Sequence, residues 1–279
     1  MGRLTETAGQ LLRPYPQFLN LSDAAAQKGS STYNALQARL VKRFNAGGMV
    51  QASYTWAKLL SDTETLTSWL EAGHPVGGVQ NPSNLRLEKS LASFHVPQRL
   101  VLSYVLDLPV GKGKKFLSGV SGIGDKVLSG WGLNGVSTFQ IGYPLALTTS
   151  NNLTNSLGGG SRPNVISTDK SIDGTAQSRI GKWFNTAAFS QPASFTFGNE
   201  SRTDPNLRGH GIANFDFTVS KQTPITESVK LEFRTEFFNL FNRVQFSDPG
   251  TSLGNPQFGI VSASMNQPRL IQFGLRLLF

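Results

Sequence analysis

The segment Gln272-Phe273-Gly274-Leu275-Arg276-Leu277-Leu278-Phe279 closes the chain and carries its clearest periodic pattern. Apolar residues at 273, 275, 277 and 279 alternate with Gln272, Gly274, Arg276 and Leu278. Strict alternation over this length predicts a β-strand with one apolar face, because successive side chains of a strand point to opposite sides. The chain thus ends on an apolar strand, whereas the ends of soluble domains are usually frayed.

The composition excludes several classes of protein. The chain has no Cys, which excludes a disulfide framework, thiol catalysis and a Cys-ligated metal. Its mean hydropathy is −0.19, and no run approaches the roughly 18 apolar residues of a membrane-spanning helix. Membrane β-strands remain possible, because they alternate and escape hydropathy windows. The formal charge of +9 is spread along the chain without a long basic patch, so we expect no nucleic-acid partner.

Residues 229–241 form the clearest internal strand. Apolar side chains and Thr235 share one face, and the charged residues Lys230, Glu232, Arg234 and Glu236 share the other. A helix would mix the two sets around its circumference. Residues 214–220 repeat the pattern, and the short connector between them, with Pro224, predicts a β-hairpin.

The same reasoning predicts about eight strands in an all-β, antiparallel arrangement. We expect them at 8–18, 32–44, 48–61, 97–108, 131–148, 213–222, 229–241 and 268–279. Apolar faces opposite charged faces suit a transmembrane β-barrel wall, because charges are tolerated in a wet or plugged lumen. The side chains expected on the convex face are Phe215, Phe217, Leu231, Phe233, Phe237, Ile271, Phe273 and Leu275.

The connections between these strands alternate in character. Those at 45–47, 109–130 and 223–228 are short or basic, and those at 19–31, 62–96, 149–212 and 242–267 are long or polar. Bacterial outer-membrane barrels have short periplasmic turns and long extracellular loops. We therefore expect all four long loops outside the cell, with the aromatic segment 183–189 folded back on the barrel rim.

No catalytic constellation is evident. His74, His95 and His210 are isolated and lack the spacing of metal ligands. The Gly111-Lys112-Gly113-Lys114 segment lacks the rest of a phosphate-binding loop and is interpreted as a basic turn at a lipid interface. We expect a protein without catalytic residues, cofactor or metal.

The terminal strand resembles the C-terminal signal of bacterial outer-membrane β-barrels. The residues that carry this resemblance are Gln272, Gly274, Leu277 and Phe279. The resemblance implies that the barrel-assembly machinery recognises this strand.

Further segments resemble TonB-dependent outer-membrane receptors, in particular the Oar-like type of Acidobacteria and other Gram-negative relatives. The Asn239-Leu240-Phe241-Asn242 segment before the last strand is similar to the Asn-Leu-Phe-Asp of that family, with Asn242 in place of Asp. The other matching segments, in order, are 12–18, 53–58, 96–104, 108–114, 183–189, 207–209, 233–242 and 269–279.

The resemblance implies that residues 1–279 are a C-terminal barrel segment for ligand uptake in the outer membrane. The family's barrel has about 22 strands. The Met1–Thr7 segment lacks the apolar core of a signal peptide. We therefore expect a fragment without the signal peptide, TonB box and plug, which would reach TonB only through the absent N-terminal part. Its direct partners would be membrane lipid, the barrel-assembly machinery, and the missing plug and strands.

Two alternatives remain open. A complete eight-stranded barrel with a structural or adhesive role is possible, because eight strands can close around a side-chain-filled interior. A soluble extracellular β-sandwich could instead bind polysaccharide through Trp56, Trp69, Trp131 and Trp183. Alternation alone does not separate these cases, because soluble antiparallel sheets also have one polar face.

Overall fold

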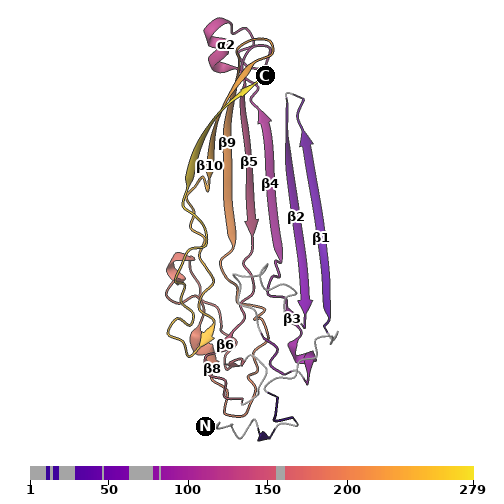
Figure 1. The fold of residues 1–279 in the computed structure, drawn as a ribbon, viewed down its shortest axis with the longest axis vertical. Coiled ribbons are helices and arrows are strands. Elements are labelled where there is room, and N and C mark those ends of the chain that lie inside the picture. The colour runs from indigo at the N-terminus through magenta and orange to yellow at the C-terminus, as the bar shows by residue number, and fades with distance from the viewer. Residues whose placement is uncertain are drawn as a thin grey trace.

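The computed structural model describes residues 11–12, 15–18, 29–45, 47–62, 78–81, 83–154 and 161–279. One large antiparallel sheet forms the body of the molecule, and its strand order is β1-β2-β4-β5-β9-β10-β12 (Figure 1). The long strands are β1 (Ser31–Arg43), β2 (Gly48–Ser61), β4 (Gln98–Asp107), β5 (Trp131–Gln140), β9 (Ile212–Pro224), β10 (Lys230–Phe238) and β12 (Leu270–Leu278).

The shorter elements lie in the connections. Strand β3 (Ser90–Leu91) pairs with β2, and β6 (Thr148–Thr149) pairs in parallel with β11 (Ser252–Leu253). The remaining short elements are β7 (Asn164–Val165), β8 (Phe189–Ser190), α2 (Gly122–Leu128), η1 (Leu85–Glu88), η2 (Gln177–Arg179) and η3 (Thr186–Ala188). No helix of the described residues is long and apolar enough to cross a membrane.

The strand register places the apolar side chains on one face of the whole sheet. Phe233 lies opposite Leu275, and Phe237 lies between Phe217 and Ile271. The same face continues to the other edge, where Leu36 pairs with Trp56. The prediction that the apolar residues of β9, β10 and β12 share a face is therefore confirmed. The members of this face that are exposed include Leu36, Trp56, Phe233, Ile271, Phe273, Leu275 and Leu277.

The opposite face carries the polar side chains. Arg234 forms ion pairs with Glu232 at 3.2 Å and with Glu236 at 3.5 Å along β10. At the far edge, Arg39 donates a hydrogen bond of 2.7 Å to Gln51. No second sheet covers either face among the described residues, which argues against the sandwich alternative.

The sheet is open in the described residues. Strands β1 and β12 stand at the two ends of the strand order and do not pair with each other. Each therefore presents an unpaired edge, which proteins rarely leave bare without some form of protection. This agrees with the expected open sheet.

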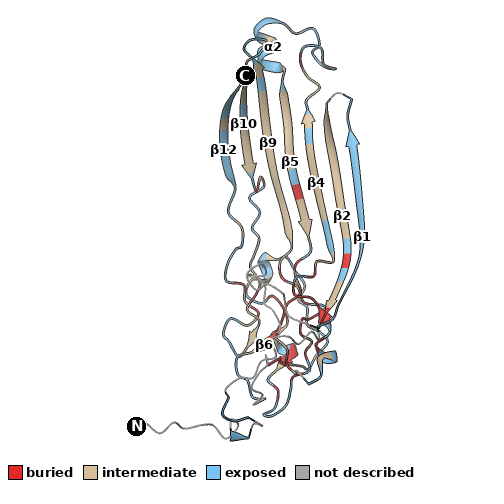
Figure 2. Ribbon diagram, turned by 45° about the vertical axis from the view of Figure 1, so that its right-hand side comes forward, coloured by how far each residue is buried: buried red, intermediate tan, exposed pale blue. Residues whose placement is uncertain are grey.

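The two ends of the sheet differ in structure. The connections between β1 and β2, between β4 and β5, and between β9 and β10 lie at the same end as the C-terminus, and the described parts of the long connections gather at the other (Figure 1). Buried residues concentrate among the long connections, whereas the sheet is mostly half-buried or exposed (Figure 2). The predicted alternation holds for the connections that follow β1, whereas 19–31 follows no strand in the described residues. The length of the 109–130 turn is explained by helix α2.

One predicted strand is wrong in its described residues, and two other strands end at least three residues earlier than expected. The described residues 11–12 and 15–18 are not in a strand, and the amide of Phe18 instead bonds the carbonyl of Tyr15 at 3.1 Å; the rest of the predicted 8–18 strand lies outside the described residues. Strand β5 ends at Gln140 rather than 148. Pro144 has no amide hydrogen for a ladder, and the apolar residues 145–147 are buried among the loops instead.

Strand β10 also ends early, at Phe238 rather than 241. Asn239 and Asn242 have φ angles of 51° and 50°, in the left-handed region that Asn tolerates better than most residues. The Asn239 side chain then holds the turn by donating to the carbonyls of Arg243, at 2.9 Å, and Gln267, at 3.2 Å. The Asn-Leu-Phe-Asn segment thus ends the strand.

Candidate functional site

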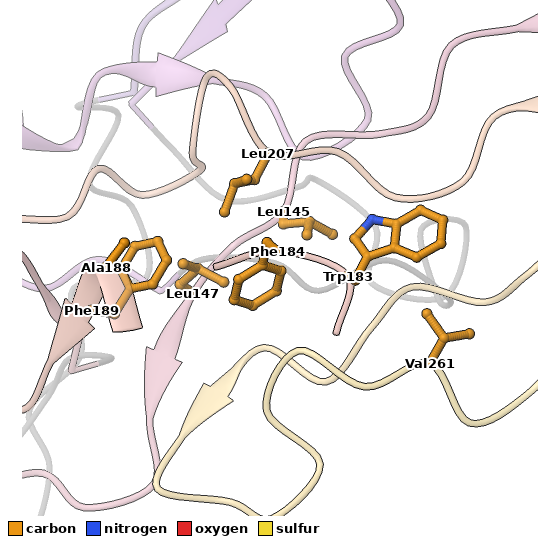
Figure 3. Close-up of a cluster of buried hydrophobic side chains, with 8 residues drawn as sticks. All are labelled: Leu145, Leu147, Trp183, Phe184, Ala188, Phe189, Leu207 and Val261. Atoms are coloured by element: carbon orange, nitrogen blue, oxygen red, sulfur yellow. The ribbon is translucent and has the colours of Figure 1, made fainter. Parts of the chain in front are cut away.

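The long connections fold into one structured unit at the end of the sheet, which we call the loop cap. It comprises the described residues of 78–97, 141–211 and 239–269. Its apolar centre is drawn in Figure 3. The buried side chains of this centre are Leu145, Leu147, Trp183, Phe184, Ala188, Phe189, Leu207 and Val261.

Aromatic packing fixes this centre. The ring of Phe184 is fully buried and meets Phe189 and Phe258 edge to face, at centroid distances of 5.9 and 5.2 Å. Trp183 is 3% exposed, and its Nε1 donates 2.7 Å to the carbonyl of Arg208. Segment 183–189 thus packs in the centre of the loop cap, to which it contributes Trp183, Phe184 and Phe189.

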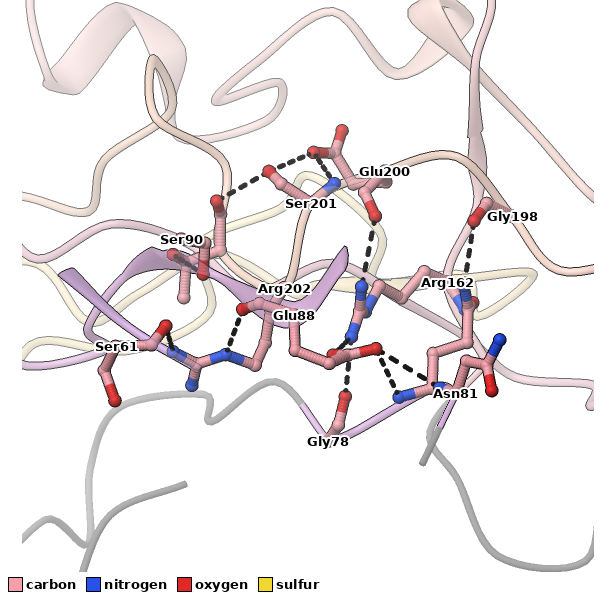
Figure 4. A network of polar contacts seen from close by, with 12 residues as sticks. Ser61, Gly78, Asn81, Glu88, Ser90, Arg162, Gly198, Glu200, Ser201 and Arg202 are labelled. Atoms are coloured by element: carbon pink, nitrogen blue, oxygen red, sulfur yellow. Dashed lines mark hydrogen bonds and ion pairs between the residues drawn. The ribbon is translucent and has the colours of Figure 1, made fainter. Parts of the chain in front are cut away.

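A buried polar network joins the cap to the sheet (Figure 4). The carboxylate of Glu88 pairs with Arg162 and accepts from the amides of Gln80, at 3.1 Å, and Asn81, at 3.2 Å. Arg202 donates to the carbonyls of Ser61, at 2.7 Å, and Glu88, at 3.1 Å. Because Ser61 is the last residue of β2, the network anchors the cap on the strand ends.

Lys170 sits between two buried carboxylates of the cap. Its Nζ lies 2.6 Å from Asp204 and 3.2 Å from Glu200. Burial acts to lower the pKa of Lys170, but the hydrogen bonds and charges of these carboxylates outweigh burial and raise it. Burial, followed by the charge of Asp204, raises the pKa of Glu200. Lys170, Glu200 and Asp204 therefore form a structural ion-pair cluster, in which the lysine charge offsets part of the cost of burying the carboxylates.

The two described histidines accept backbone hydrogen bonds in or beside the loop cap. His95 Nδ1 accepts from the amide of Leu59 at 3.4 Å, and His210 Nδ1 accepts from that of Phe246 at 3.2 Å. Burial, followed by the charges of Arg208 and Lys58, lowers the pKa of His95 to about 4. Within the described residues no group of three His, Asp or Glu could hold a metal ion. His74 lies outside the described residues.

The residues of the expected assembly signal lie along β12 and just beyond it. Gln272 and Gly274 are on the polar face, Leu277 is on the apolar face and 51% exposed, and Phe279 is 97% exposed. A Cβ at Gly274 would come no closer than 4.0 Å to Arg234. These four residues therefore lie together at the C-terminal edge of the sheet. Within the described residues, neither the Phe279 side chain nor the lack of a side chain at Gly274 serves packing.

Sequence reasoning missed the polar network of the cap. Glu88 and Arg162 are separated by 74 positions, and Arg202 and Ser61 by 141. No local spacing marks such pairs, because they meet only when the loops fold together.

Comparison with known proteins agrees with this geometry. Residues 2–272 match the protein family described as the outer membrane beta barrel domain. No curated protein and no solved structure matches the chain. The match covers almost the whole chain, and a single antiparallel sheet with an apolar and a polar face is the structure that such a domain requires. The chain therefore belongs to the outer membrane beta barrel domain family.

Proposed function

We propose that the chain forms wall strands and extracellular loops of a TonB-dependent receptor for ligand uptake. The observation that carries this proposal is the loop cap, in which the described residues of three long connections fold together at one end of the sheet. Outer-membrane barrels place long loops on the cell exterior. A structured cap at that end supplies a surface on which a ligand can be captured. The role is binding and permeation, without catalysis or a cofactor.

The sheet dimensions support a membrane-spanning wall. Strand β5 carries Trp131 at one end of its apolar face and Phe139 at the other, a span of about nine residues. Lys221 Nζ lies over the Trp131 ring at 5.6 Å from its centroid, and Trp is a residue type enriched at membrane interfaces. The polar ladder of Arg39, Gln51, Glu232, Arg234 and Glu236 then faces the lumen.

The open edges support a role within a larger barrel. In this proposal further strands pair with β1 and β12, and a plug fills the lumen, making contact with TonB through its own N-terminal segment. The chain alone would not transport. The second candidate is a complete small barrel with a structural or adhesive role, which the family match fits equally well.

Two observations distinguish these candidates. A plug-encoding reading frame directly upstream of the gene, with ligand uptake that stops when TonB is removed, supports the receptor. The alternative gains support if the 279-residue chain folds alone in lipid vesicles to a heat-modifiable form. Cysteine pairs across β1 and β12, such as Ala38→Cys with Phe273→Cys, would then form a disulfide, which the otherwise Cys-free chain makes easy to detect.

The orientation is tested by surface labelling. A single cysteine in the loop cap, for example Ser178→Cys, is expected to react with a membrane-impermeant maleimide on intact cells. Ser118→Cys, in the turn region at the opposite end, is the matched control and is expected to react only after the outer membrane is opened. The reverse pattern would refute the proposed orientation.

We also propose that Phe279 and Gly274 act in recognition by the barrel-assembly machinery. Removing Phe279 is expected to lower the amount of receptor in the outer membrane while synthesis and export continue, measured by membrane fractionation. Because its side chain is 97% exposed, the fold itself loses little. Unchanged surface levels would remove the signal interpretation.

A further inference from the structure

A cavity of about 810 Å³ lies where the loop cap meets β1 and β2; we call it the rim cavity. Side chains on the apolar face of the sheet form its floor, namely Leu36, Trp56 and Leu60. Residues 89–97 and 201–208 of the cap form its walls. Its volume falls within the range of about 300–1,000 Å³ that is usual for small-molecule sites.

The rim cavity is positively charged. Lys58, Lys89 and Arg208 line it, and no carboxylate of the described residues does. Within the described residues neither lysine forms an ion pair. The nearest carboxylates in the described sequence are engaged elsewhere, since Glu88 binds Arg162 and Asp62, four residues after Lys58, accepts from the amide of Ser30. An anionic group in the cavity would therefore meet uncompensated cations.

The walls of the cavity are fixed by buried contacts. Arg208 Nη1 donates to the carbonyls of Gly142, at 3.1 Å, and His95, at 3.5 Å. Thr203 is fully buried, and its hydroxyl bonds that of Ser90 at 3.2 Å. Burial, followed by the nearby charges of Arg208 and Lys58, lowers the pKa of His95 to about 4, so the imidazole is neutral at pH 7. A ligand would thus find a preformed site.

The position of the cavity indicates what kind of anion it receives. Lys58 follows Trp56 on the same face of β2, and Trp and Tyr mark the boundary between hydrocarbon and headgroups in membrane barrels. An apolar floor that continues into the lipid-facing surface suits an acyl chain, and the cations above it suit a phosphate.

From this arrangement we propose that the rim cavity binds the phosphate-bearing headgroup of an anionic membrane lipid, with an acyl chain along Leu36 and Trp56. Assignment to the outer leaflet rests on the orientation proposed above, whereas lipid binding itself does not. A failure of the labelling experiment would move the site to the other leaflet without removing it.

The test uses the 279-residue chain in detergent micelles, titrated with dihexanoyl phosphatidic acid and followed by tryptophan fluorescence. Near-neutral dihexanoyl phosphatidylcholine and inorganic phosphate are the comparison probes. The double variant Lys58→Gln/Lys89→Gln is expected to bind phosphatidic acid about 25-fold more weakly, at about fivefold for each lysine near a membrane surface. Lys58→Arg/Lys89→Arg is expected to retain binding, and near-UV circular dichroism checks that both variants are folded.

The matched control is Lys112→Gln/Lys126→Gln, which removes the same charge at the opposite end of the sheet. It is expected to bind within about twofold of the unmodified chain, because charges beyond a Debye length are screened. If this control lost as much affinity for phosphatidic acid as the double variant at Lys58 and Lys89, the binding would be general electrostatic attraction, and the proposed site would be refuted. Equal affinity for phosphatidylcholine, or for inorganic phosphate, would likewise overturn the assignment to an anionic lipid.

Discussion

The substitution Glu88→Gln removes one charge from the centre of the loop cap. Glu88 is 1% exposed, and its partner Arg162 is 3% exposed. Glutamine keeps the size of the side chain and one carbonyl oxygen. The amides of Gln80 and Asn81 can therefore keep their acceptor, while the Arg162 guanidinium loses its ion pair with the Glu88 carboxylate.

The size of the effect follows from these contacts. Removing one member of a buried ion pair costs about 3–5 kcal/mol, because the other charge remains buried without compensation. Arg162 retains the carbonyls of Gly78, at 3.0 Å, and Glu200, at 3.4 Å, as neutral acceptors. We therefore expect the low end, about 3 kcal/mol, for Gln. Glu88→Ala also leaves the amides of Gln80 and Asn81 without an acceptor, at a cost of about 1–3 kcal/mol each, so the loss of stability should be larger.

Amide hydrogen exchange measures this loss in the cap separately from the sheet. The amides of Glu200 and Asp204 are useful probes, because they bond the carbonyls of Pro163, at 3.1 Å, and Leu145, at 2.8 Å, inside the cap. A destabilisation of about 3 kcal/mol speeds exchange through cap opening roughly 150-fold. Amides in β5 and β9 should change little.

The control is Glu232→Gln on the polar face of β10. Its partner Arg234 is 43% exposed, so the pair contributes less than about 1 kcal/mol. The reasoning would be refuted if Glu88→Gln accelerated exchange in the cap by less than about fivefold, or if Glu232→Gln had the same effect there.

Three further predictions concern packing and pH. Phe184→Ala should cost the loop cap about 3–5 kcal/mol through the cavity it leaves, measured by urea-dependent proteolysis of the loops. Phe195→Ala is the control and should have little effect, because the Phe195 side chain is 77% exposed. Gly135→Ala should destabilise the sheet by about 1–3 kcal/mol in thermal unfolding, because the new Cβ would meet Tyr104 and lie 2.7 Å from the carbonyl oxygen of Asp216. Gly274→Ala is the control and should be neutral, because its Cβ would have open space. The stability of the loop cap should fall as the pH drops from about 6.5, the ordinary pKa of histidine, to about 4, the pKa of His95 in the folded chain, because the unfolded chain binds the proton first. In amide hydrogen exchange measured against pH, His95→Gln should flatten that part of the profile. An unchanged profile would contradict the assignment to His95.

Several features of the fold could be read from residues alone. The period of two in segments 229–241 and 272–279 predicted both strands, and the charges opposite the phenylalanines predicted which side chains share a face. Connection lengths predicted which loops gather at which end. These features are local, because a strand's face follows directly from the alternation of its own side chains.

Strand ends were less predictable. The apolar run at 145–147 continued the pattern of β5 in sequence, yet those side chains leave the sheet and fill the centre of the loop cap. Periodicity cannot distinguish continuation of the strand from packing in the loop cap, because both place the apolar side chains away from water. Only the surrounding loops decide between them.

The sequence by itself determined that this is an antiparallel, two-faced sheet with alternating short turns and long loops. Only the tertiary structure decided that the loops form an ordered cap, that Glu88, Arg162 and Arg202 anchor it, and that a basic cavity opens at its rim. The physical reason is the distance along the chain. Alternation acts between neighbouring residues, whereas buried ion pairs and cavities arise between segments that meet only after the sheet has brought their loops together.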